Sequence, residues 1–227
     1  MQTANGKPLA ANACDKINWA DGVDMKTGRP KVTEVFKKAL VGENVTVWPS
    51  VTGSTNWRHM AHSPKSGNLF INVIHIGMTN EAPEPPKNLT MGRPSGPGAV
   101  KRATVYDDPN ALGYLKAVGP MTGKASWSVP YKSPHFSSTM MTASNLVFTG
   151  VMNGEFLALD ADTGKLLWSF QTPSGIVGHP ITWERDGKQY VTMMSGIGGV
   201  YALRSYDPNL VKAPTGVTPW TFGLFDK

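Results

Sequence analysis

The chain contains two copies of one hairpin, 41 positions apart, and this repeat restricts the possible fold more than any other feature. Residues 117–127 align with residues 158–168 and share Ala, Thr, Gly, Lys and Trp at five of the eleven positions. Residues 156–160 have the period of two that is typical of a strand, and the Asp160–Gly164 turn cluster returns the chain as a second strand. Weaker copies of the turn lie at residues 23–30 and 63–70.

A period near 40 residues with several short strands in each unit is typical of β-propellers. We therefore expect an all-β chain that forms a partial β-propeller, with Trp127 and Trp168 docked between adjacent blades. The alternative is two unrelated hairpins that share a common turn. The expected boundaries are a partial blade at 1–40, a blade at 45–131 with a long insertion at 77–110, a blade at 136–171 and a partial closing blade at 176–227.

The expected blades are incomplete for a closed ring. Two whole blades and two partial ones fall short of the four or more that a closed propeller needs, and the first blade starts in its middle. We therefore expect the chain to be one arc of an eight-bladed ring. The blade at 45–131 should have an inner strand over 56–62. Its insertion, rich in Pro, Gly and Asn, should be a long loop.

Composition excludes several classes of protein and of site. The net charge is +6, but the basic residues are dispersed, so nucleic-acid binding is not indicated. The single cysteine, Cys14, excludes an intramolecular disulfide and a cysteine metal cluster. No apolar run reaches the roughly 18 residues of a membrane span, and the N-terminus has no export signal.

Candidate functional residues are few. No Ser/His/Asp arrangement, HExxH motif or paired carboxylates are present, and His59 and His62 would face opposite sides of a strand, where they are poor co-ligands. The exception is Asn56 beside Trp57: an amide for hydrogen bonds next to a flat ring for stacking suits a planar, oxygen-rich ligand. The alternative is a turn Asn beside a core Trp.

The chain resembles the C-terminal part of the pyrroloquinoline quinone (PQQ)-dependent alcohol dehydrogenases, eight-bladed propellers that include the methanol dehydrogenases. The resemblance implies periplasmic oxidation of a small primary alcohol by hydride transfer to PQQ, with a calcium or lanthanide ion at the quinone and a c-type cytochrome as electron acceptor. The segments that carry it follow the family's order and are residues 18–30, 53–57, 148–150, 157–170, 172–178, 186–191 and 195–199.

The resemblance also assigns site residues. Asn56 and Trp57 match a pair that contacts the quinone, and Ile197 matches a residue that faces the central funnel. Phe136 stands where methanol dehydrogenases often carry a Trp. The family's metal ligands, catalytic Asp and vicinal cysteines lie upstream of the matched region, so this chain is expected to hold no catalytic residue and no metal ligand.

Three hypotheses follow. The chain is a fragment or truncated member of this family and inactive alone, or it works with a separate chain that supplies the other blades. The third, from a different class, is a non-catalytic propeller that acts as a scaffold. Open blade edges would favour association into a homo-oligomer.

Overall fold

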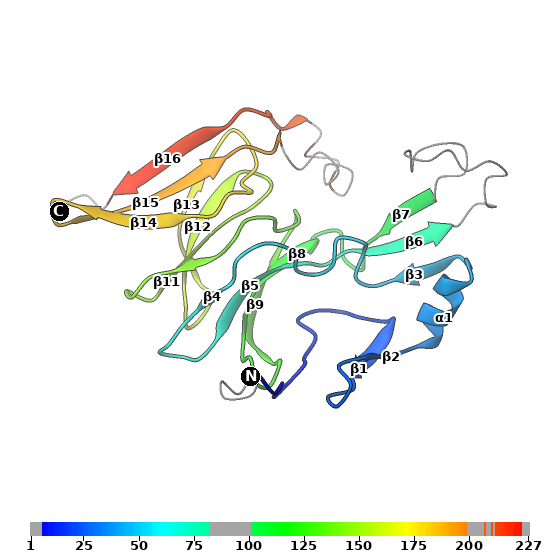
Figure 1. The fold of residues 1–227 in the computed structure, drawn as a ribbon. Coiled ribbons are helices and arrows are strands. Elements are labelled where there is room, and N and C mark those ends of the chain that lie inside the picture. The colour runs from blue at the N-terminus through cyan, green and yellow to red at the C-terminus, as the bar shows by residue number, and fades with distance from the viewer. Residues whose placement is uncertain (1–5, 82–100, 199–206, 208–209, 211, 224–227) are drawn as a thin grey trace. The chain divides into compact units, whose positions relative to one another are not determined.

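The computed structural model describes residues 6–81, 101–198 and 212–223, together with Asp207 and Leu210. The chain divides into two compact units (Figure 1). The first contains Met1–Ser54 and Ile76–Asp107, and the second contains Thr55–His75 and Asp108–Lys227. The residues that carry the repeat at 117–127 and 158–168 both lie in the second unit.

The second unit consists of three antiparallel sheets. The first blade has the order β4 (Ala61–His62), β5 (Leu69–Ile74), β8 (Gly113–Val118), β9 (Ala125–Tyr131). The second blade has β10 (Met140–Met141), β11 (Leu146–Gly150), β12 (Glu155–Asp160) and β13 (Leu166–Gln171) in sequence order. The third sheet is β14 (Ile181–Arg185), β15 (Lys188–Ser195) and β16 (Thr218–Gly223). Two four-stranded sheets and a third of three described strands form a partial propeller, as predicted.

Strand β12 shows why these sheets must stack. Its apolar side chains alternate, and each set enters a different core. Leu157 and Leu159 pack in a cluster with Phe70 and Leu115 of the first blade. Phe156 and Ala158 pack in a second cluster, against which Trp220 and Phe222 of β16 also lie. The second blade therefore buries both of its faces, one against each neighbour.

Two copies of the repeated turn are capped in the same way by an Asp side chain. Asp160 accepts hydrogen bonds from the backbone of Asp162 and Thr163 at 3.1 and 2.8 Å, and Asp24 does the same for Lys26 and Thr27 at 2.8 and 3.1 Å. The turn glycine has a positive φ in every copy, a conformation that is costly for residues with a Cβ. These glycines and their φ angles are Gly28 (71°), Gly67 (72°), Gly123 (69°) and Gly164 (72°).

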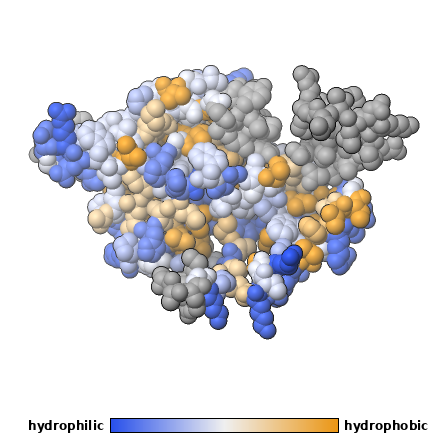
Figure 2. Space-filling model, viewed as in Figure 1, coloured by the Kyte–Doolittle hydropathy of each residue, from blue (hydrophilic) through white to orange (hydrophobic). Residues whose placement is uncertain are grey.

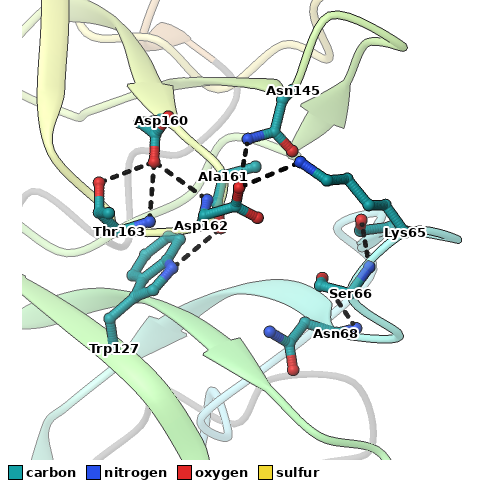
Figure 3. A network of polar contacts seen from close by, with 10 residues as sticks. Lys65, Ser66, Asn68, Trp127, Asn145, Asp160, Ala161, Asp162 and Thr163 are labelled. Carbon is teal, nitrogen blue, oxygen red and sulfur yellow. Dashed lines mark hydrogen bonds and ion pairs between the residues drawn. The ribbon is translucent and has the colours of Figure 1, made fainter.

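Trp127 of the first blade docks on the turn of the second blade, as the sequence predicts. Its indole Nε1 donates to the carbonyl oxygen of Ala161 at 3.0 Å. The ring covers Gly164 so closely that a Cβ there would lie 2.7 Å from it. Figure 3 shows this contact together with Asp162, which joins Lys65 of the first blade at 3.3 Å and accepts from Asn145 at 3.0 Å.

Trp168, the matching residue of the second blade, contacts the third sheet. Its ring centroid is 5.0 Å from that of Phe222 on β16 and 6.1 Å from that of Phe156. Both repeated tryptophans therefore lie between adjacent sheets, which confirms the expectation. Other apolar side chains stay at the surface, among them Leu166 and Leu167 of β13. Figure 2 shows such hydrophobic patches scattered between hydrophilic ones on the face in view.

The first unit corrects two expectations. Residues 77–110 were expected to be a loop, but β6 (Gly77–Glu81) and β7 (Lys101–Val105) form a sheet with β3 (Val45–Val47), in the order β3-β6-β7. The Pro-rich residues 82–100 between these strands lie outside the described residues. Trp48, after β3, packs where a Cβ on Gly77 would lie 2.5 Å from its ring. The pairing partner of β6 is β3, about 30 residues earlier in the chain, and the local sequence pattern does not reveal this pairing.

The first unit also contains a helix that an all-β reading omits. Strands β1 (Ala20–Val23) and β2 (Pro30–Val32) form a two-stranded sheet, and α1 (Glu34–Leu40) follows directly. Its first turn carries Glu34 and its last turn carries Lys37 and Lys38, the charges that a helix dipole favours. With only seven residues and no buried side chain, the helix lacks the long apolar period that marks helices in a sequence.

The inner strand expected at 56–62 is also wrong in extent, since only Ala61 and His62 are paired as β4. Residues before β4 are held by side chains of the second blade instead. The backbone N–H of His59 donates to Ser138 Oγ at 3.0 Å, and that of Ala61 donates to Thr139 Oγ1 at 2.9 Å. Side-chain bonds that replace a strand ladder are not visible as alternation in the sequence.

The docking of Trp127 predicts unequal costs for two alanine substitutions in equivalent turns. Gly164→Ala should destabilise the chain more than Gly67→Ala, because both residues have φ near 72° but a Cβ at Gly67 meets nothing within 4 Å. We expect about 1–2 kcal/mol for the positive φ in each variant, and about 1–3 kcal/mol more for Gly164→Ala, where the ring must move. Urea unfolding measures both, and equal losses would contradict the docking.

Candidate functional site

The predicted pair Asn56 and Trp57 lies in the irregular segment before β4, at the surface of the second unit. Asn56 Oδ1 accepts a hydrogen bond from the backbone N–H of Trp57 at 2.8 Å. The Trp57 side chain is 60% exposed, so one of the largest flat surfaces in the chain is open to solvent. The alternative of a core Trp is therefore wrong, while the turn-like bond of Asn56 is present.

Ile197, the third predicted residue, has a different environment. It follows β15 and is completely buried. Its backbone N–H donates to Ser174 Oγ at 3.2 Å, and its side chain lies next to Gly175, where an added Cβ would be 3.3 Å from Ile197 Cδ1. In this structure Ile197 contacts protein and not solvent.

Arg58, next to Trp57, is a buried cation that the sequence does not single out. It is 6% exposed, and its guanidinium carbon lies 4.2 Å from the centre of the Phe136 ring. Nη1 donates to the carbonyl oxygen of His135, while Nε and Nη2 have no hydrogen-bond partner among the residues that the structure describes. Burial lowers the pKa of Arg58 to about 10, so the group remains charged at neutral pH. The Phe136 ring thus faces a buried cation.

His135 lies beside Arg58 and is completely buried. Its Nδ1 is 3.1 Å from the carbonyl oxygen of Gly150. A carbonyl only accepts, so Nδ1 carries the proton and Nε2 is an acceptor, and no described residue donates to this Nε2. Burial lowers the pKa of His135 to about 3, and the imidazole is neutral at pH 7.

Arg58 and His135, with Asn72, form what we call the buried polar cluster. Asn72 Nδ2 donates to Ser137 O and Thr149 Oγ1 at 2.6 and 2.7 Å, but its Oδ1 has no hydrogen-bond partner within the described part of the chain. The cluster therefore offers unused donors on Arg58 and unused acceptors on His135 and Asn72. Unpaired buried polar groups cost about 1–3 kcal/mol each unless water or a ligand satisfies them. The only sequence signal for this cluster is that Arg58 directly follows Trp57.

Other chemistry is limited. The described part of the chain contains no group of three or more His, Cys, Asp or Glu residues that could hold a metal ion. Cys14 is a partly exposed thiol. No described helix has the length and apolarity that crossing a bilayer requires. The open Trp57 ring, beside the amide of Asn56, is the feature of the second unit best suited to a polar aromatic ligand.

The neutral, buried state of His135 predicts a pH dependence of stability. In the unfolded chain its pKa is about 6.5, so acid protonates the unfolded state first. The contribution is fully present above pH 6.5 and is lost as pH falls towards 3, by at most about 1.4 kcal/mol per pH unit.

The matched variant is His135→Asn, whose amide keeps a donor for Gly150 O and does not titrate. Urea unfolding at pH 7.5, 6.0 and 5.0 should show a steeper loss in the natural chain than in this variant. Parallel losses would mean that His135 is not buried in its neutral form.

Comparison with known proteins relates these features to one family. Residues 92–191 match the family model described as the β-propeller domain of glucose/ethanol/alcohol dehydrogenases, named for PQQ. The chain is 38% identical over 233 residues to a quinoprotein ethanol dehydrogenase of Pseudomonas aeruginosa, with 99% of this chain and 37% of that protein covered. It is 37% identical over 220 residues to a 1-butanol dehydrogenase (quinone) of Thauera butanivorans, with 92% and 34% covered.

Solved structures agree. A europium-containing methanol dehydrogenase superposes with a TM-score of 0.79 at 27% identity, covering 95% of this chain and 41% of that one. The quinohemoprotein alcohol dehydrogenase ADHIIG of Pseudomonas putida superposes with a TM-score of 0.75 at 28% identity, covering 96% and 33%. This chain spans about a third of the length of the curated relatives it matches. In sequence and in fold, the chain belongs to the quinoprotein alcohol dehydrogenase β-propeller family.

Proposed function

We propose that this chain forms part of the propeller of a PQQ-dependent enzyme that oxidises a small primary alcohol. Identity of 37–38% to quinoprotein alcohol dehydrogenases over nearly the whole chain supports the reaction class. Within the chain, the open indole ring of Trp57 is the observation that carries the proposal. An exposed ring held next to a hydrogen-bonded Asn is a suitable surface for a flat quinone.

The residues fit PQQ, which is planar and rich in oxygen. Trp57 offers a face for stacking, and the amide of Asn56, oriented by its bond to the Trp57 backbone, offers polar atoms beside that face. Ile197 would support the wall from within, because it is buried behind the Gly-rich end of β15. Asn56 and Trp57 would bind and orient the cofactor, Ile197 would only support their surroundings, and none of the three would move a proton.

When bound, PQQ supplies the hydride acceptor for the alcohol, polarised by a calcium or lanthanide ion. We propose that the metal ligands and the catalytic base lie in blades of the family's ring that this chain does not match. Those blades would belong to the same protein, to a complementing chain or to an assembly of several copies. Electrons would leave for a c-type cytochrome, and the periplasm is the proposed compartment.

The first prediction concerns Trp57. Trp57→Ala should weaken PQQ binding by about 0.5–1.5 kcal/mol, roughly 2- to 12-fold, because one stacking face is lost. The measurement is equilibrium dialysis of the chain against PQQ with calcium present. Met60→Ala is the control, since Met60 is 53% exposed and lies three residues further along the same segment. Equal PQQ affinities of the two variants would contradict the proposal that Trp57 binds the cofactor.

The second prediction concerns activity. The isolated chain should not reduce a redox dye in the presence of PQQ, calcium and ethanol, because the proposal assigns the metal ligands and base to other blades. Addition of a chain that carries the remaining blades of a family member should restore ethanol-dependent dye reduction. Turnover by the isolated chain would contradict this division of the site. Such turnover would not contradict the binding of PQQ to Trp57, so the activity test and the binding test can be contradicted independently of one another.

A further inference from the structure

Two histidines far apart in the chain meet in the second unit. The imidazole rings of His59 and His179 have centroids 5.4 Å apart and planes at 72°. His59 precedes β4 of the first blade, and His179 precedes β14 of the third sheet. Both side chains are exposed. Among the described residues, no hydrogen bond reaches a ring nitrogen of either histidine.

One segment of the second blade holds both histidines in place. Ser138 Oγ accepts from the backbone N–H of His59 at 3.0 Å, and Thr139 N–H donates to the carbonyl oxygen of His59 at 3.1 Å. On the other side, Ser137 Oγ donates to the carbonyl oxygen of Gly178 at 2.8 Å. Residues 137–139 therefore bridge the two backbones, so the ring spacing does not depend on mobile surface loops.

The spacing of the rings suits a shared metal ion. An imidazole nitrogen binds zinc at about 2.0–2.1 Å, which places the ring centroid about 3.2 Å from the metal. Two such rings at the tetrahedral angle have centroids about 5.2 Å apart, close to the observed 5.4 Å. Rotation about each Cβ–Cγ bond hardly moves the centroid, so the exposed rings can turn a nitrogen of each towards one point without backbone movement.

The chemistry of the pair also favours a metal. A metal ligand must be a neutral imidazole with a free lone pair. Partial desolvation and the neighbouring His59 lower the pKa of His179, which favours the neutral form of its ring. The sequence spacing of His59 and His62 makes them poor co-ligands of one another. The partner of His59 is instead 120 residues further along the chain, where no sequence motif links the two.

We propose that His59 and His179 bind a divalent transition-metal ion, with water at the remaining positions. Imidazole selects zinc, copper and nickel, whereas calcium, magnesium and other hard ions prefer oxygen ligands. The site is therefore separate in chemistry from the calcium or lanthanide site proposed for the whole enzyme. It also does not depend on PQQ binding, because both ligands and the residues that hold them are in this chain.

Isothermal titration of the purified full chain with zinc chloride tests this proposal. The natural chain should bind one zinc ion. His59→Gln and His179→Gln should each weaken binding by about 10- to 100-fold, at least the loss that follows removal of an outer-shell partner of a ligand. His62→Gln is the matched control, because His62 is exposed and only three residues from His59; it should change the affinity less than twofold.

A second measurement identifies the ligands directly. Copper(II) added to the chain should show coordination by two imidazole nitrogens in electron paramagnetic resonance, reduced to one in either Gln variant. Circular dichroism should give the same spectrum for all variants, so a loss of binding is not a loss of fold. The proposal is overturned if the natural chain binds no zinc, if both Gln variants bind as it does, or if His62→Gln loses as much affinity.

Discussion

The fold depends on the burial of both faces of each blade, which a single blade cannot achieve. On β12, Leu157 and Leu159 enter one core and Phe156 and Ala158 enter the other. Neither core exists without the neighbouring sheet. The contact of Trp127 with Ala161 and Gly164 fixes how far apart two blades lie, because it joins a hydrogen bond to a close ring contact. Stability, blade order and the position of the loops before the inner strands follow from this stacking.

The loops before the inner strands carry the chemistry for the same reason. Residues 137–139 of the second blade bind the segment that contains Trp57, Arg58 and His59, and they also bind the carbonyl of Gly178. The exposed ring of Trp57, the buried cation Arg58 and the imidazole pair are thus all positioned by residues 137–139. A blade repeat places equivalent loops at the same end of each sheet, and side chains from distant parts of the chain become neighbours there.

Sequence reasoning succeeds where structure is local. The repeated turns and the hairpin strands of the second blade follow from side-chain capping, positive φ and a period of two. The two docked tryptophans follow from the 41-residue repeat, which indicates stacked blades. It fails where a partner is distant. Strand β6 pairs with β3 across the intervening segment and with β7 on its other side, and α1 is too short to show a period. The burial of Arg58 against Phe136 and the meeting of His59 with His179 depend on blade stacking, which no local pattern records.

A double-mutant cycle across one blade interface tests the stacking most directly. Phe156 of β12 and Phe222 of β16 stack with centroids 5.7 Å apart. Free energies of unfolding for Phe156→Leu, Phe222→Leu and the double variant give their coupling. If the sheets stack as described, the coupling should be about 0.5–1.5 kcal/mol, as for other aromatic pairs. Effects that add to within about 0.3–0.5 kcal/mol would mean that the two sheets do not meet, and the partial propeller would be wrong.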